Sequence, residues 1–145
     1  METPVSRTAA SVRVVVRPWP DPVVEAHGFA PNSGYVEYCW LPVLGPTATW
    51  LYRRLGNLVL VHDDGYDVDL VDLAVSLGLG EGLGRHAPLV RALERLERFG
   101  AMDVTESALL VRRALAPLPE ALARRLSESA RRAHDRCQAP GPSPI

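Results

Sequence analysis

The stretch RHAPLVRALERLERFG, residues 85–100, decides the fold, because its spacing predicts a helix with one apolar and one basic face. Leu89, Leu93 and Leu96 fall at i, i+4 and i+7, which is the stripe by which a helix faces a core. The opposite face is charged and carries Arg91, Glu94, Arg95 and Arg98. Gly100 stands where a left-handed residue often follows a helix, so we expect the helix to end there.

A second helix and a hairpin flank this stretch. Residues 69–78 predict a shorter helix that Asp69 caps and Gly78 ends. Its buried stripe is expected at Leu70, Leu73, Ala74 and Leu77. Residues 101–104 and 108–114 are β-prone runs separated by three residues, which is the spacing of a hairpin. Helix, glycine turn, basic helix and hairpin in this order are typical of a winged helix-turn-helix, whose second helix usually lies in the DNA major groove.

The residues before this module predict an N-terminal extension. Residues 1–10 are expected to be disordered, and residues 11–19 to form a strand, which we place at the edge of a sheet. One face of that strand carries Val12, Val14 and Val16. Residues 21–32 are expected to be irregular or briefly helical.

Two helices are expected between this extension and the module. Ser33 is placed to cap the first helix, and Pro42 should end or kink it. Pro46 opens the second helix at its first position, and Gly56 is expected to end it. The buried face of the second helix is expected at Ala48, Leu51, Tyr52 and Leu55. Residues 58–61 are β-prone, and we expect them to form a small strand that pairs with the hairpin.

Charge is distributed unevenly along the 145 residues, whose formal net charge is −1. Residues 1–80 carry five Arg against nine acidic residues, a net of −4, whereas residues 81–145 carry eleven Arg against eight, a net of +3. An electrostatic footprint for nucleic acid would therefore lie in the second half. All 16 basic residues are arginine, which fits the codon bias of a high-GC bacterial genome as well as a demand for guanidinium groups.

Several function classes find no support in the sequence. No G-x-S-x-G motif occurs, and the four histidines lack a metal-ligand spacing, so we expect neither catalysis nor a cofactor. Cys39 and Cys137 make no disulfide framework, which favours a reducing cytoplasm. The aspartates of residues 63–72 are interpreted as turn and cap residues rather than a cation site. No apolar run reaches the roughly 18 residues of a membrane span.

The residues CWLPVLGPTATWLYRRLG, 39–56, combine an aromatic, a proline, a Leu-Gly-Pro turn and an Ala-x-x-Leu-Tyr-x-x-Leu helix. This string resembles the opening helix of winged-helix domains in bacterial primosomal and replication-initiation proteins of the DnaD/DnaB kind. Residues 33–119 as a whole are similar to small winged-helix proteins of high-GC bacteria. The resemblance implies a winged-helix fold, which serves either DNA binding or protein interaction.

The residues expected to contact double-stranded DNA belong to the basic helix and the returning hairpin strand: Arg85, His86, Arg91, Arg95, Arg98, Arg112 and Arg113. An alternative for the helix face is a solvated lattice of i,i+4 salt bridges, each worth about 0.2–0.5 kcal/mol. The hairpin tip, residues 105–107, is short and acidic, which favours a protein partner over a phosphate. Six aromatic residues are expected to pack in the core: Trp19, Trp40, Trp50, Tyr35, Tyr38 and Tyr52.

Residues 117–137 predict a C-terminal amphipathic helix. Its thin apolar stripe consists of Leu118, Leu122, Leu126 and Ala133. The helix either packs back on the domain, pairs two copies as a homodimer, or lies along DNA. Residues 138–145 are expected to be a disordered tail.

The sequence thus predicts an α+β, mainly α, fold, with a winged helix-turn-helix within residues 11–116, an N-terminal strand and helix extension and a C-terminal helix. The expected function is that of a cytoplasmic, DNA-binding transcriptional regulator without catalysis and without a membrane partner. The alternative is a winged-helix adaptor that binds a protein of the replication or transcription machinery.

Overall fold

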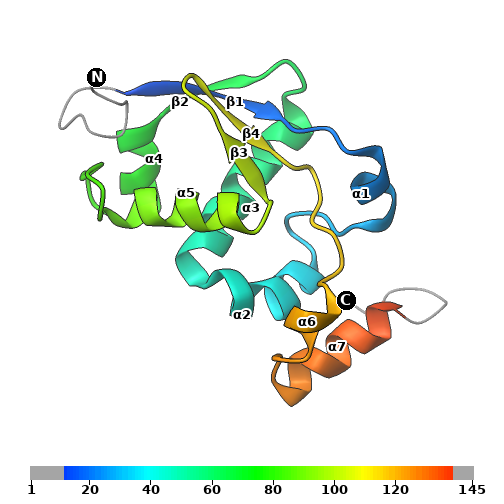
Figure 1. Cartoon of the computed structure of the whole chain (residues 1–145). Helices are drawn as coiled ribbons and strands as arrows, with labels where there is room; N and C mark the ends of the chain where they lie inside the picture. The colour runs from blue at the N-terminus through cyan, green and yellow to red at the C-terminus, as the bar shows by residue number, and fades with distance from the viewer. Residues whose placement is uncertain (1–11, 139–145) are drawn as a thin grey trace.

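The computed structural model describes residues 12–138, which form an α+β fold with more helix than strand, as expected (Figure 1). The strands are β1 (Arg13–Pro18), β2 (Tyr66–Asp69), β3 (Met102–Val104) and β4 (Ala108–Val111), in the sheet order β2-β1-β4-β3. The helical segments are α1 (Pro22–His27), the π-helix η2 (Val36–Trp40), α2 (Leu41–Leu44), α3 (Pro46–Val61), α4 (Leu70–Ser76), α5 (Pro88–Arg98), α6 (Glu120–Ala123) and α7 (Glu128–Gln138). Helices α3, α4 and α5 lie on one side of the sheet, and the core fills the space between them.

Strand β1 lies inside the sheet, so its expected position at the edge is wrong. It runs antiparallel to β2 and parallel to β4. Its apolar face is buried as expected, at Val12, Val14 and Val16. Pro18, which has no N–H to donate, is the last residue of the strand, and Arg13 and Arg17 lie on the exposed face. Neither the proline nor the two arginines therefore prevent β1 from pairing on both sides.

Helix α3 does not end at Gly56 but continues to Val61. A Cβ at Gly56 would lie 2.6 Å from the ring of Pro31, so the glycine allows close packing inside the helix instead of ending it. Residues 58–61 are therefore helical, and the strand expected there is wrong. The small strand is β2, which follows the turn at Gly65 and pairs with β1 rather than with the hairpin.

The segment before α3 changes its helical type at Pro42. The N–H of Val36 donates to Oγ of Ser33 at 3.3 Å, so Ser33 caps the segment as expected. The N–H of Leu41 donates to the carbonyl of Val36, which is the wider i+5 pattern of a π-helix. Pro42 has no N–H for an i+4 bond, and it sits in the first turn of α2, where none is needed. The proline thus separates η2 from α2.

Helix α4 begins and ends as the sequence predicts. Oδ1 of Asp69 accepts the N–H of Val71 at 2.9 Å and that of Asp72 at 3.4 Å. Gly78, with φ of +75°, follows the helix. Leu70, Leu73 and Ala74 are buried, and Leu77 is half-buried.

Helix α5 begins at Pro88, three residues later than the predicted helix over residues 85–100. Ala87 is extended, as residues before proline prefer, so Arg85 and His86 lie in a turn. Gly100 follows the helix with φ of +76°, as expected. The predicted faces are confirmed, because Leu89, Leu93 and Leu96 are buried while Arg91, Glu94, Arg95 and Arg98 are exposed. The expected hairpin is also present, as β3 and β4 joined through residues 105–107.

The C-terminal segment forms two helices, α6 and α7, instead of the single helix expected over residues 117–137. Leu118 and Ala133 are buried, and Leu122 and Leu126 are half-buried against the core. The hydroxyl of Tyr35 shares a hydrogen bond with Nδ1 of His134 at 2.7 Å and accepts the N–H of Leu118 at 2.8 Å. The C-terminal segment thus packs on the domain, which is one of the three arrangements expected. Gln138 belongs to α7, and the other tail residues, like residues 1–11, lie outside the described part.

The aromatic residues divide between the core and the surface. Tyr35, Tyr52 and Trp40 are buried, as expected, and Trp19 is half-buried. Tyr38 and Trp50 are 49% and 61% exposed, so their expected place in the core is wrong. Trp50 lies on α3 one residue before the buried Leu51, on the outward-facing side of the helix.

Candidate nucleic-acid interface

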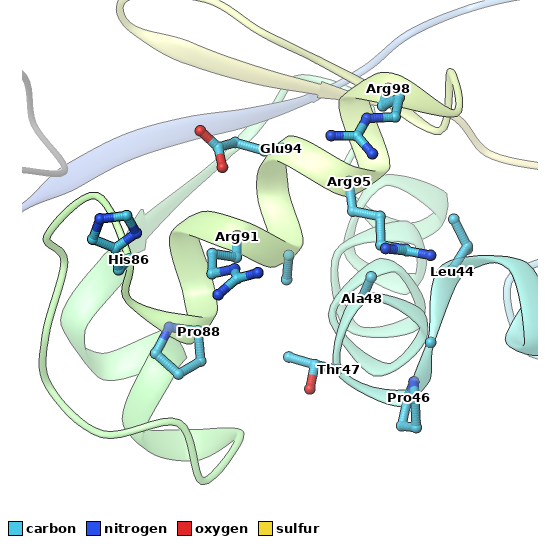
Figure 2. A pocket seen from close by; sticks show the side chains of 12 residues that line it. Leu44, Pro46, Thr47, Ala48, His86, Pro88, Arg91, Glu94, Arg95 and Arg98 are labelled. Atoms are coloured by element: carbon cyan, nitrogen blue, oxygen red, sulfur yellow. The ribbon is translucent and has the colours of Figure 1, made fainter.

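The outer face of α5 and the start of α3 enclose a groove of about 650 Å³ (Figure 2). Arg91, Arg95 and Arg98 of α5 form one wall, and residues 45–48 form the other. His86, from the turn before α5, lies at one end. The packing of α5 on α3 through the buried leucines fixes the distance between the two walls. Two elements that are far apart in the sequence therefore build one basic site.

Arg95 is the anchored arginine of the groove. Its Nη2 and Nε donate to the carbonyl of Val43 at 2.8 and 3.3 Å, and its guanidinium lies 5.8 Å from the ring centroid of Phe99. These contacts hold the side chain against the end of α2. A carbonyl is neutral, and Arg95 forms no ion pair with a carboxylate of the described chain, so its side chain keeps its positive charge in the groove.

The charges of the outer face do not pair with one another. Glu94 points away from Arg91 and Arg95 (Figure 2). Among residues 12–138, neither Arg91 nor Arg98 has a carboxylate within salt-bridge distance. The alternative of an i,i+4 salt-bridge lattice is therefore not formed. The groove presents guanidinium groups that are free to meet an anion.

The start of α3 adds a second source of positive potential. Gly45 precedes Pro46 with φ of +82°, and within the described chain no side chain caps this end of the 16-residue helix. The first amides of a helix have no partner inside it and carry the positive end of its dipole, so they attract anions. Thr47 and Ala48 line the groove at this end. The sequence analysis did not assign these two residues to the site. The signal for them was a helix that begins with Gly-Pro and has no Ser, Asp or Asn to cap its first amides.

Arg85, Arg112 and Arg113 lie outside the lining of the groove. Nε of Arg112 donates to the carbonyl of Gly100 at 2.6 Å, Nη1 bonds to Asp21 at 3.1 Å, and the guanidinium lies 4.0 Å from the centroid of the Trp19 ring. Arg113 pairs with two carboxylates, those of Glu25 and Asp63, at 3.6 and 3.1 Å. Both arginines thus fasten the end of β4 to neighbouring segments, and Arg85 is exposed in the turn before α5.

The Arg112 pair also affects the acid that it contacts. The N–H of Val24 donates to Asp21, and this bond, together with the Arg112 guanidinium, holds the pKa of Asp21 below its usual value of 3.8. Asp21 is the N-cap of α1, where its carboxylate also accepts the N–H of Val23. These contacts of Asp21 and Arg112 join α1 to the end of the hairpin.

Cys39, Asp63 and Asp69 lie outside the groove and have structural surroundings or partners. Burial raises the pKa of the Cys39 thiol to about 11, which keeps it protonated and unreactive at neutral pH. Asp69 caps α4, and Asp63 pairs with Arg113.

Within residues 12–138, no three His, Cys, Asp or Glu side chains come together as metal ligands. No helix of that part is both long and apolar enough to cross a membrane.

The groove contains more of the residues predicted to contact DNA than any other part of the described surface. The sequence identified His86 and the three arginines of α5, and the structure brings them together with the start of α3. Comparison of the chain with protein-family models, with curated proteins and with solved structures finds no match.

Proposed function

We propose that the protein is a DNA-binding transcriptional regulator of the winged helix-turn-helix type, without catalysis. The element order α3, β2, α4, α5, β3, β4 supports this proposal, because it is the order of three helices, a small strand and a hairpin in winged helices. Strand β1 would be an addition that lies between the small strand and the hairpin. In this arrangement α5 is the helix that enters the major groove.

The observation that carries the proposal is the free positive charge on the outer face of α5. Arg91 and Arg98 are exposed without a carboxylate partner in the described chain, and the helix packs firmly through its opposite face. A rigid helix with unpaired guanidinium groups suits the phosphates and guanine edges of duplex DNA. The amides at the start of α3 would receive a phosphate beside that helix.

The test is a titration of a labelled random duplex, followed by fluorescence anisotropy at about 50 and about 200 mM salt. We expect affinity to fall with salt with a log–log slope of about −0.9 for each phosphate contacted. Arg91→Ala should weaken binding by about 1–3 kcal/mol if it contacts a base edge, with relaxed specificity at that base pair. Arg98→Ala should make the slope shallower by about 1 if it contacts a phosphate.

The matched control for both variants is Arg124→Ala. Arg124 is exposed after α6 and lies outside the groove, so its loss removes the same charge from a different surface. We expect this variant to bind the duplex as the parent does. A folded parent protein that binds no duplex at about 50 mM salt would contradict the proposal.

The second candidate function is an adaptor that holds a protein of the replication or transcription machinery. The acidic hairpin tip favours it, since Glu106 and its two neighbours are exposed and would repel a phosphate backbone. The hairpin is also fixed to α5, because Glu97 accepts the N–H of Val104 at 3.3 Å. The tip is therefore held in place as an acidic surface.

Glu106→Lys separates the two candidate functions. If α5 lies in the groove of a duplex, the hairpin tip approaches the backbone, so a lysine there adds a phosphate contact and steepens the salt slope by about 1. If the tip instead serves a protein partner, duplex affinity stays as it was, and a partner captured by the parent from a cell extract is lost. Glu81→Lys, an equal charge change in the loop between α4 and α5, is the control.

A further inference from the structure

Trp50 is an exposed indole at the centre of a second surface. It is 61% exposed on α3, with a shallow hollow on each side. The first hollow lies between Trp50, the start of α3 and Leu79, and the second lies between Trp50, Asn57 and His62. Arg54 borders both hollows. Together these two hollows are called the Trp50 surface.

The Trp50 surface is continuous with the basic groove. Pro46 and Thr47 line both the groove and the first hollow, and Trp50 and Arg54 line both hollows. A ligand that leaves the groove over the first turn of α3 therefore reaches the indole directly. Figure 2 shows Pro46 and Thr47 at the start of α3.

The charge along this route is mostly positive. Five arginines line the groove and the Trp50 surface, namely Arg53, Arg54, Arg91, Arg95 and Arg98. Glu94, on the wall of the groove, is the one carboxylate among these lining residues of the described chain. Arg54 donates to the neutral Oγ of Ser76 at 2.8 Å, whereas Arg53 lies 3.6 Å from Glu37. The other four arginines have no carboxylate within salt-bridge distance in the described chain, so the route is complementary to a polyanion.

An indole beside arginines is suited to an unpaired base more than to a duplex. Bases inside a duplex are stacked on each other and present only their edges, whereas every unpaired base has a free π-face. Such a base stacks on an aromatic side chain while neighbouring arginines meet its phosphates. We propose that the Trp50 surface binds a single-stranded extension of the DNA whose duplex part lies on α5. This inference rests on the proposed function and specifies its ligand as a junction of double- and single-stranded DNA.

The experiment compares a blunt duplex of about two helical turns with the same duplex carrying an extension of about five nucleotides at its 5′ or 3′ end. We expect the parent protein to bind one extended duplex at least about fivefold more tightly than the blunt one. Trp50→Ala should remove this difference and leave blunt-duplex affinity unchanged, while Trp50→Phe should keep part of it. Because Trp50 is exposed, both variants should keep the parent's thermal unfolding curve.

A second readout reports the stacking itself. The extension should quench indole fluorescence in the parent protein, and Trp50→Phe, which retains Trp19 and Trp40, should lose that quenching. Equal affinity for blunt and extended duplexes would overturn the inference, as would an unchanged preference in Trp50→Ala. Quenching by a poly-glutamate peptide and not by the extension would assign the Trp50 surface to an acidic protein segment, and would also overturn it.

The blunt duplex separates this inference from the proposed function. If the blunt duplex is not bound but a single strand alone quenches Trp50, the proposal for α5 fails and the junction is overturned as the ligand, although Trp50 contacts single strands. If the blunt duplex is bound through Arg91 and the extension adds nothing, the proposal for α5 stands and the single-strand site fails.

Discussion

Leu93→Ala is expected to lower the free energy of unfolding by about 2–5 kcal/mol. Leu93 is buried on the face of α5 that packs against α3, so truncation removes apolar burial and leaves a cavity in a close-packed core. Urea unfolding followed by circular dichroism measures the change. The matched variant is Arg91→Ala on the opposite face of α5, which should change stability by no more than about 0.5 kcal/mol.

The comparison of these two variants tests the orientation of α5. Arg91 is a better control than Arg95, because the Arg95 side chain bonds to the carbonyl of Val43 and contributes to packing. If both variants lowered stability by the same amount, the assignment of a buried and a free face to α5 would be wrong. The basic groove would then lose its structural basis.

Tyr35→Phe is expected to produce the next largest loss of stability. The Tyr35 hydroxyl is the partner of two buried groups, the N–H of Leu118 and Nδ1 of His134. Removing the oxygen leaves both groups unpaired in the interior, at about 1–3 kcal/mol for each. Burial raises the pKa of Tyr35, so the phenol remains protonated and able to donate at neutral pH.

The control for Tyr35→Phe is Tyr38→Phe. Tyr38 is 49% exposed on the same segment, and its hydroxyl can be hydrated by water, so we expect a change within about 0.5 kcal/mol. Chemical unfolding with far-UV detection compares the two variants. Equal stability of Tyr35→Phe and the parent would show that the hydroxyl does not hold α7 to the domain.

The faces of α5 and the cap of α4 could be predicted because their causes are local. The spacing of Leu89, Leu93 and Leu96 fixes which side of a helix is buried, whatever it packs against. Asp69 caps α4 through amides two and three residues away. The hairpin follows equally from two β-prone runs with a short loop between them.

The errors concern features that depend on distant parts of the chain. A glycine at position 56 predicts the end of a helix by its residue type. In the structure it lies inside α3, where its missing side chain leaves room for Pro31. The sequence pattern of β1 is the same for an edge strand and for a central strand, because the neighbours of a strand depend on tertiary pairing. Trp50 was assigned to the buried face of its helix by its spacing, but it lies on the outside of α3.

The candidate site also combines features that could be predicted from local sequence with features that depend on distant residues. The arginines of α5 follow from helical periodicity, whereas the second wall of the groove comes from the packing of α3 beside it. Arg112 and Arg113 were grouped with α5 because they return along the hairpin. Their carboxylate partners Asp21, Glu25 and Asp63 are far away in the sequence, so the ion pairs could not be foreseen.

The central position of β1 has a consequence for synthesis of the chain. In the parallel pair, Val15 lies opposite Ala108, which is 93 residues later (108 − 15). At about 5–20 residues per second, β1 would be made about 5–20 s before β4. Strand β2 is made before β4 and pairs with one edge of β1, but the other edge of this valine-rich strand stays unpaired until β4 follows. An unpaired edge is the condition under which nascent segments aggregate or bind chaperones. The first strand to be synthesised thus completes its pairing only after the last strand has been made.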